Sequence, residues 1–347
     1  MATDALPTTL DTEQFVSDIL GTIERERERE IVARRFGLFD RKETLEQIGE
    51  LLGITRERVR QLEKAVITRL TVAAEGGNVP HITEVEALLC DKLQSMGQVA
   101  RVSELAAAIM KDPTRIDQAR IAFLAQLSPN LVVVNEDDNF YHAVGIKNVH
   151  DEATIKKLVH TLIDTVKQLG EPDTIENIAT AAGIEDPQHA AALASTSKHL
   201  ASLAGRWGLT KWPMVNPKNI RDKIYVILRE NGKHMHFNDI AKSIKDSSFK
   251  RKDVTTQAIH NELIKDKRFV LIGRGIYALK EWGYEKGTVA DIITDILKKE
   301  GGPLHRDEIV KRVLKSRYVK ETTILLNLQG KPQFKRVAKA TYGLAEA

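Results

Sequence analysis

Four polar side chains that suit hydrogen bonding to base edges are gathered between positions 56 and 61. Arg56 and Arg60 can each fork onto guanine in the major groove of duplex DNA. Glu57 can accept from cytosine, and Gln61 can bridge adenine. On a helix, this spacing places all four on one face of the first two turns. The pattern predicts a helix that inserts its N-terminal end into the major groove.

The flanking residues predict two short helices joined by a tight turn. Thr44 and Gln47 have the spacing of a capping box, in which each side chain accepts from a backbone amide at the start of the helix. Gly53 breaks this helix, and Thr55 can cap the next one, which we expect over about residues 56–70. Two such helices around a turn that contains glycine describe a helix-turn-helix.

Two more helices are expected upstream. Residues 10–21 have an acidic start and one apolar face. The run Glu24–Glu30 alternates in charge, which is typical of a solvated helix, and Gly37 ends it. We therefore expect residues 1–75 to form one domain.

Residues 34–38 (RRFGL), 44–50 (TLEQIGE) and 54–63 (ITRERVRQLE) resemble region 4 of the sigma-70 family. In that family, region 4 reads the promoter −35 element and docks on RNA polymerase. The resemblance spans about residues 10–72. No aromatic-rich segment like the one that melts the −10 region accompanies it, so we do not expect a complete sigma factor.

By matching position, the resemblance implies two groups of DNA-contacting residues. The residues that would face bases are Arg56, Glu57, Arg60 and Gln61. The residues that would meet the DNA backbone or flank it are Arg27, Thr44 and Arg58.

Beyond a plausible linker at 75–80, one pattern recurs four times. A long helix is expected to end at each of Gly97, Gly170, Gly232 and Gly301. Two helical stretches and a β-prone segment follow each glycine, and the β-prone segments carry Tyr141, Trp207, Tyr277 and Tyr342. Three helices and a hairpin make a winged helix. The sequence thus predicts a mainly α protein with tandem winged-helix modules at 82–146, 151–213, 217–283 and 286–345.

The last two modules resemble the HARE-HTH family, which includes the N-terminal domain of the RNA polymerase delta subunit. The segments that carry the resemblance are 236–241 (HFNDIA), 269–279 (FVLIGRGIYAL), 305–310 (HRDEIV) and 341–344 (TYGL). Lys250, Arg251 and Lys252 precede the expected third helix of the third module, and Arg274 lies in its wing turn. We expect these four cations to contact the DNA backbone, with Arg274 entering a minor groove.

Charge is distributed unevenly along the chain. Residues 218–347 carry 28 Lys and Arg against 16 Asp and Glu, a net charge of +12. Residues 1–75 have a net charge of −3 and residues 76–217 one of −5. The last third therefore suits a polyanionic partner, although a solvated lysine-rich surface is the alternative.

No catalytic constellation is visible. A single cysteine, Cys90, excludes a disulfide framework and a cysteine-clustered zinc site, and the ten histidines form no ligand pattern. Phosphate-binding and nucleophile-elbow motifs are absent. We expect no enzymatic activity, cofactor, metal or small-molecule substrate.

No apolar run reaches about 18 residues, and the N-terminus lacks a secretory pattern. We expect no membrane partner and a location in the bacterial cytoplasm or nucleoid.

These features lead to three hypotheses. The first is a transcription factor that binds duplex DNA through the helix-turn-helix and works with the RNA polymerase core. The second is an adaptor that binds polymerase or other proteins without reading promoters, which the acidic middle of the chain favours. The third is a non-catalytic specificity part of a DNA-modifying system.

Overall fold

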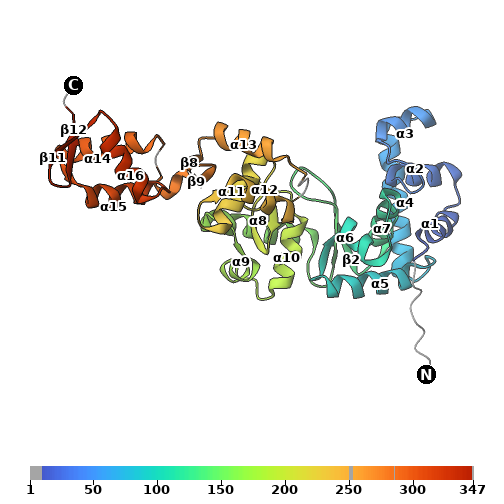
Figure 1. The fold of residues 1–347 in the computed structure, drawn as a ribbon. Coiled ribbons are helices and arrows are strands. Elements are labelled where there is room, and N and C mark those ends of the chain that lie inside the picture. The colour runs from blue at the N-terminus through green and yellow to red at the C-terminus, as the bar shows by residue number, and fades with distance from the viewer. Residues whose placement is uncertain (1–9, 250–252, 285, 346–347) are drawn as a thin grey trace. The chain divides into compact units, whose positions relative to one another are not determined.

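The computed structural model describes residues 10–249, 253–284 and 286–345. The chain divides into two compact units, residues 1–210 and residues 211–347. Both are mainly helical, with four small β-sheets distributed along the chain (Figure 1). No helix in the described ranges is long and apolar enough to cross a membrane.

Four helices open the first unit. They are α1 (Thr12–Gly21), α2 (Glu26–Phe36), α3 (Leu45–Leu52) and α4 (Arg56–Glu75). The sequence predicted all four, but α4 continues one turn and more beyond the expected end near residue 70. A left-handed Gly37 ends α2, at a φ of 69°. An added Cβ there would meet the backbone nitrogen of Lys42 at 2.8 Å, so only glycine fits this turn.

A repeating order of elements follows, namely helix, short strand, helix, helix, strand, strand. In the first unit the first repeat is α5 (Ile82–Ser95), β1 (Val99–Arg101), α6 (Val102–Ile109), α7 (Arg115–Leu127), β2 (Leu131–Val134) and β3 (Ala143–Ile146). The second repeat is α8 (Glu152–Leu169), β4 (Asp173–Thr174), α9 (Ile175–Ala182), α10 (Pro187–Thr196), β5 (Leu200–Leu203) and β6 (Arg206–Leu209).

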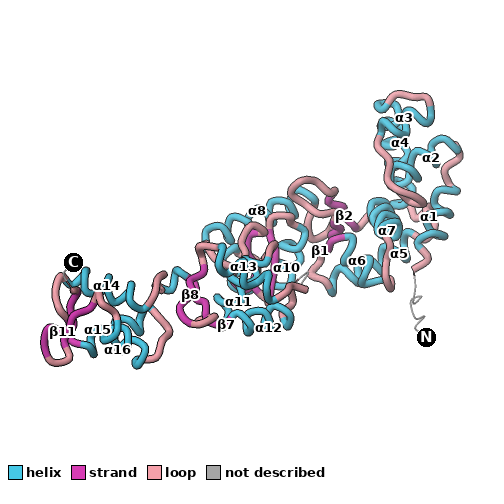
Figure 2. The backbone as a smooth tube through the Cα atoms, turned by 45° about the horizontal axis from the view of Figure 1, so that its top comes forward, coloured by secondary structure: helices cyan, strands magenta, loops and turns pink. Residues whose placement is uncertain are grey.

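The second unit contains two more repeats of the same order. The third repeat is α11 (Ile220–Asn231), β7 (Met235–His236), α12 (Phe237–Asp246), α13 (Thr256–Lys265), β8 (Phe269–Gly273) and β9 (Ile276–Leu279), with a short 3₁₀ helix at Lys280–Trp282. The fourth repeat is α14 (Val289–Glu300), β10 (Leu304–His305), α15 (Arg306–Ser316), α16 (Glu321–Gly330), β11 (Phe334–Ala338) and β12 (Thr341–Leu344). Figure 2 shows the small strands among the helices of both units.

Each repeat builds one antiparallel three-stranded sheet whose central strand is the last in sequence. The first strand of each sheet was not foreseen, because two or three residues are too few to show an alternating pattern. Three of the four marker aromatics lie opposite this short strand: Trp207 pairs with Asp173, Tyr277 with Met235 and Tyr342 with Leu304. The fourth marker, Tyr141, precedes β3 and lies outside the sheet.

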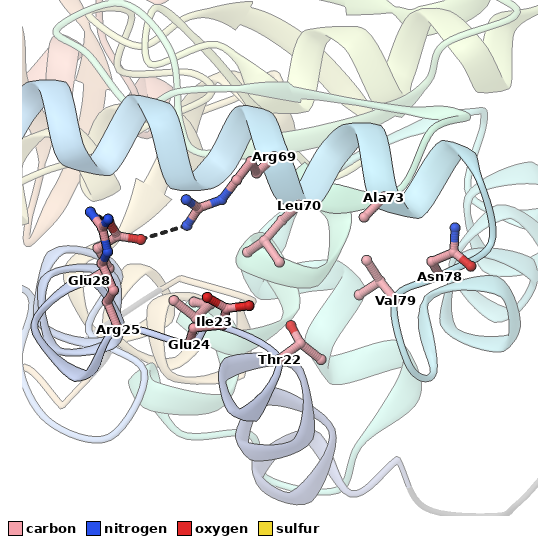
Figure 3. Close-up of a pocket in the computed structure, with 10 residues that line it drawn as sticks. All are labelled: Thr22, Ile23, Glu24, Arg25, Glu28, Arg69, Leu70, Ala73, Asn78 and Val79. Carbon is pink, nitrogen blue, oxygen red and sulfur yellow. Dashed lines mark hydrogen bonds and ion pairs between the residues drawn. The ribbon is translucent and has the colours of Figure 1, made fainter.

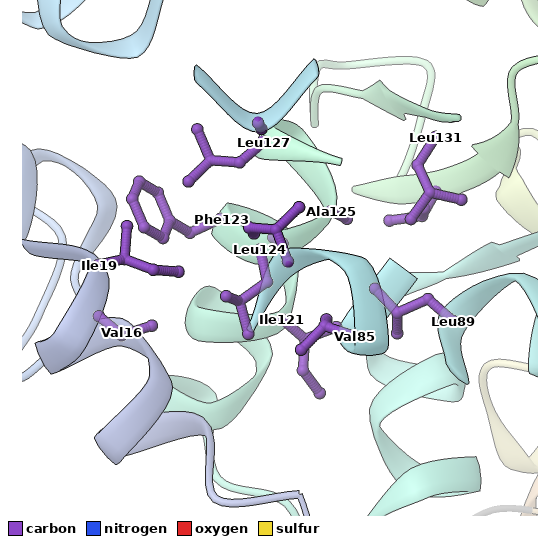
Figure 4. Packing of buried hydrophobic residues seen from close by; sticks show 14 of the residues in the cluster. Val16, Ile19, Val85, Leu89, Ile121, Phe123, Leu124, Ala125, Leu127 and Leu131 are labelled. Carbon is purple, nitrogen blue, oxygen red and sulfur yellow. The ribbon is translucent and has the colours of Figure 1, made fainter. Parts of the chain in front are cut away.

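A single large core joins α1, α2 and α4 to the first repeat. It includes Leu70 of α4. Figure 4 shows Val16 and Ile19 of α1, Leu89 of α5 and Phe123 of α7 within it. The sequence predicted separate domains at 1–75 and 82–146, and this continuous core packs the two segments together. The helix-turn-helix itself is built on a smaller core of Ile31, Ile48 and Val59.

The hairpin of the first repeat docks on the second repeat. Phe140 forms an isolated β-bridge with Ser197, and the Tyr141 amide donates to the carbonyl of Thr196 over 2.8 Å. The Arg101 guanidinium lies 4.1 Å from the centre of the Tyr141 ring. A turn at Asp137–Asn139 belongs to this loop, where the Asp137 carboxylate accepts from the Phe140 amide.

The third and fourth repeats dock in a different way. The Tyr318 amide, in the segment between α15 and α16, donates to the carbonyl of Ile272 over 3.1 Å at the edge of β8. The rings of Tyr318 and His234 lie 4.4 Å apart. In each pair, a backbone amide of a loop residue donates to the other repeat, and side-chain contacts add to this bond.

Candidate nucleic-acid interface

Local capping fixes the two helices of the helix-turn-helix. The Gln47 amide donates to Thr44 Oγ1 over 3.2 Å, and the Thr44 amide donates to Gln47 Oε1 over 2.9 Å. The Arg58 amide donates to Thr55 Oγ1 over 3.2 Å at the start of α4. Both caps occur as the sequence predicted, and each contributes about 1 kcal/mol to helix stability.

The turn between α3 and α4 brings two backbones close together. Gly53 takes the left-handed conformation, with a φ of 65°. At Gly49 an added Cβ would lie 2.7 Å from the carbonyl oxygen of Ile54. The glycine at position 49 therefore lets α3 approach the turn and sets the angle at which α4 leaves it.

The four residues predicted to read bases share one exposed face of α4. The side chain of Arg56 is 73% exposed, and those of Glu57 and Arg60 are each 55% exposed. Gln61 is also exposed. The opposite face buries Val59 in the small core. Within the described residues of the first unit, no segment covers this exposed face.

Carboxylates hold the arginines of this face in place. Arg60 forms a two-pronged ion pair with Glu57, with atom separations of 2.7 and 2.9 Å. The Arg60 guanidinium holds the pKa of Glu57 below its usual value. Arg56 Nη1 lies 3.0 Å from Glu46 Oε1, so α3 holds the first side chain of this face of α4. Gln61 Nε2 also donates to Glu57, over 3.4 Å.

The structure places the residues predicted to meet the DNA backbone as follows. Arg27 is exposed, and its guanidinium donates to the Leu52 carbonyl over 2.9 Å at the end of α3. Thr44 is exposed at the N-terminus of α3, where the helix dipole favours an anion. Arg58 donates to Gln61 Oε1 over 3.3 Å. Arg274 is exposed in the two-residue turn between β8 and β9.

Lys250, Arg251 and Lys252, the remaining predicted contacts, lie outside the described residues.

A buried carboxylate that the sequence pattern did not reveal positions α4. Glu28 belongs to the alternating run Glu24–Glu30, which predicted a solvated helix, yet its side chain is only 7% exposed. Its carboxylate lies 2.6 Å from Arg69 Nη2 and 3.3 Å from Arg25 Nη1, beside a cavity of about 510 Å³ between α2 and α4 (Figure 3). Hydrogen bonding to Arg69 holds the pKa of Glu28 below its usual value. Alternating signs cannot show which carboxylate faces another helix.

A buried arginine ties the first repeat to the helix-turn-helix. Arg120 on α7 donates through Nε to the Leu38 carbonyl over 2.8 Å, in the loop after α2. Its Nη2 lies 2.6 Å from the Glu13 carboxylate of α1, and its Nη1 lies 3.5 Å from that of Asp117. Since this side chain is 8% exposed, these bonds fix the loop that leads into α3.

Comparison with known proteins identifies the segment that contains this interface. Residues 25–71 match the family described as Sigma-70, region 4. A stretch of 56 residues is 46% identical to the RNA polymerase sigma factor sigB of Arabidopsis thaliana and 45% identical to the RNA polymerase sigma factor SigA of a Bacillus species.

Each of these matches covers 16% of this chain, and 9% and 15% of the two relatives. The resemblance inferred from the sequence over about residues 10–72 is confirmed for residues 25–71. The resemblance of residues 217–283 and 286–345 to the HARE-HTH family stays a prediction.

The chemistry that was set aside from the sequence can also be located. No group of three or more His, Cys, Asp or Glu in residues 10–249, 253–284 and 286–345 is arranged to hold a metal ion. Cys90 is half-buried on α5, and burial raises the pKa of its thiol.

Proposed function

We propose that the protein is a DNA-binding transcription regulator that resembles part of a sigma factor. The observation that carries the proposal is the capped α4 with Arg56, Glu57, Arg60 and Gln61 on its exposed first two turns. These side chains have the donors and acceptors that distinguish base pairs in the major groove. The match to sigma-70 region 4 supports a −35-like element as the target and RNA polymerase as the partner.

We also propose that the four repeats are winged-helix modules that support binding. The order of helices and strands and the antiparallel sheet support this assignment. The two repeats of the basic part of the chain would add contacts to the DNA backbone, with Arg274 at a wing turn. Such contacts supply affinity that does not depend on sequence.

The second candidate function is a polymerase-binding adaptor that does not read promoters. Residues 1–210 carry 23 Lys and Arg against 32 Asp and Glu, a net charge of −9 around the helix-turn-helix. An acidic unit gains less from phosphate neutralisation than a basic one, which favours a protein partner for part of this surface.

Replacement of Arg56 separates the two functions. If α4 reads bases, Arg56→Ala should weaken binding to the preferred duplex by about 1–3 kcal/mol and relax the preference at one position. Lys157→Ala removes an exposed cation of α8, away from the strands and their turns, and serves as the control. Selection from a random duplex library gives the preference, and capture of the polymerase core by each variant tests the adaptor role. Unchanged binding of Arg56→Ala to every sequence, with polymerase capture intact, would favour the adaptor.

A further inference from the structure

A cleft beside the base-reading face is shared by the helix-turn-helix and the first repeat. Its cavity of about 570 Å³ lies among the end of α2, the loop before α3, the middle of α4, and the ends of α7 and β2. A second hollow of about 340 Å³ continues it along α7. Lys42, Gln126 and Asn135 line both cavities. The first repeat therefore contributes polar groups directly next to α4.

Besides Arg35 and Arg60, which pair with glutamates, two lysines line the cleft. Lys42 and Lys64 line it, and neither forms an ion pair within the described ranges. Partial desolvation, with Arg35 nearby, lowers the pKa of Lys42, although Glu63 and Glu136 oppose the shift. An anion in the cleft would stabilise the charged form of this lysine.

The two carboxylates of the cleft have other cationic partners. Glu63 lies 3.3 Å from Arg35 Nε, and Glu136 lies 2.8 Å from Lys198 Nζ of the second repeat. Hydrogen bonding to Glu136 raises the pKa of Lys198. The lysines of the cleft therefore remain available to an anion.

The position of the cleft connects it to the base-reading face. Arg60 belongs to both surfaces. Leu45, which lines the cleft, follows the exposed N-cap Thr44 at the start of α3, a favourable place for a phosphate. Hydrogen-bond donors thus extend from the N-terminus of α3, past Arg60 and Lys64, to the side-chain amides of Gln126 and Asn135.

We propose that this cleft binds a backbone phosphate of the duplex next to the bases that α4 reads, with Gln126 and Asn135 of the first repeat as donors. The proposal rests on the proposed function, since it requires α4 to lie in the major groove. It gives the first repeat a direct part in binding DNA. A phosphate is the occupant that fits, because the cleft pairs surplus positive charge with neutral amide donors.

Charge-introducing, nearly isosteric replacements test the proposal in the full chain. Gln126→Glu and Asn135→Asp should each weaken binding to duplex DNA at least about tenfold, because a hydrogen bond to a charged group is worth more than one factor of ten. Gln94→Glu adds the same charge on the exposed face of α5, away from the cleft, and should change affinity less than about twofold by long-range repulsion alone. Lys42→Gln should reduce the slope of log affinity against log salt by about 1.

The outcomes distinguish this proposal from the proposed function. Sequence preference should survive in the cleft variants, whereas Arg56→Ala relaxes it. Affinities of Gln126→Glu and Asn135→Asp equal to that of Gln94→Glu would overturn the cleft proposal and leave base reading by α4 intact. Loss of polymerase capture with unchanged DNA affinity would overturn it in favour of a protein-docking cleft. If the unaltered protein binds no duplex DNA at all, both the proposed function and the cleft proposal are wrong. Thermal unfolding of each variant shows that it is folded.

Discussion

The hairpins of the two units differ in chemistry although they follow the same order of elements. In the third and fourth repeats, a two-residue turn carries an exposed cation: Arg274 before Gly275, and Lys339 before Ala340. Gly275 and Ala340 both have a positive φ, of 70° and 55°. The corresponding turn of the second repeat is Ala204–Gly205 and has no charge.

The first repeat uses its hairpin in yet another way. Its long loop between β2 and β3 carries acidic residues and buries Phe140 against the second repeat. The same order of elements is thus used in two different ways. The hairpins of the first unit build structure or have an uncharged turn, while the turns of the second unit present positive charge. The net charges of the two halves of the chain follow the same division.

The largest expected effect tests the structural side of this comparison. Phe140→Ala should lower the free energy of unfolding of the first unit by about 3–5 kcal/mol, because it empties a buried aromatic site between two repeats. Phe140 is 2% exposed and contacts the edge of the His160 ring at a centroid distance of 5.8 Å. Urea-induced unfolding measures the change.

Arg274→Ala is the matched replacement in the second unit. An exposed turn residue should change stability by no more than about 0.5 kcal/mol. Equal losses of unfolding free energy for Phe140→Ala and Arg274→Ala would contradict the idea that only the first hairpin has a structural role.

The next effect concerns binding. The double variant Arg274→Gln, Lys339→Gln should weaken binding to all duplexes alike and lower the salt slope by about 2, since each lost phosphate contact removes about 1. Lys157→Gln, on an exposed face of α8, is the control and should leave the slope unchanged. Titrations of DNA at several salt concentrations give the slopes. An altered sequence preference in the double variant would show that these turns read bases, against the proposed backbone role.

Local signals in the sequence predicted the parts of the molecule that short-range geometry fixes. The capping box of Thr44 and Gln47, the cap at Thr55 and the helix-ending Gly53 depend on neighbours within a few residues, and all occur in the structure. The exposed face of α4 follows from the same helical register. A mainly helical chain with a sigma region 4-like segment was therefore accessible from the sequence.

Contacts between distant segments were not accessible in this way. Glu28 meets Arg69 across 41 positions, and Arg120 meets Glu13 across 107. Nothing in the spacing of either residue shows that its partner lies on another helix. The position of Gln126 and Asn135 beside α4 was not predictable for the same reason, because only the packing of the first repeat against α4 brings them there.

The smallest expected effect concerns pH and again separates the two pairs of repeats. In the first pair, His150 Nε2 lies 3.0 Å from His189 Nε2, and His189 Nδ1 lies 2.7 Å from the Gly97 carbonyl oxygen. Since that carbonyl requires a donor, His189 Nε2 accepts from His150 in the neutral pair. Burial and the neighbouring His189 lower the pKa of His150, although Asp151 opposes the shift.

A lowered histidine pKa means that the unfolded chain takes up its proton first as the solution is acidified. The contribution of His150 to stability is therefore complete above about pH 6.5 and decreases as the pH falls from there toward the lower folded-state pKa. His142 has a pKa lowered by burial in the same unit, so only the difference between variants isolates His150. Because His150 is partly exposed, the effect should be small. Between pH 7.5 and 5.5, the Tm of the first unit should fall by up to about 2 °C more in the unaltered protein than in His150→Gln, since about 1 kcal/mol moves Tm by 2–4 °C at this size. An equal fall in both proteins would show that the histidine pair does not couple the first two repeats to pH. A larger fall in His150→Gln would reverse the sign of the argument.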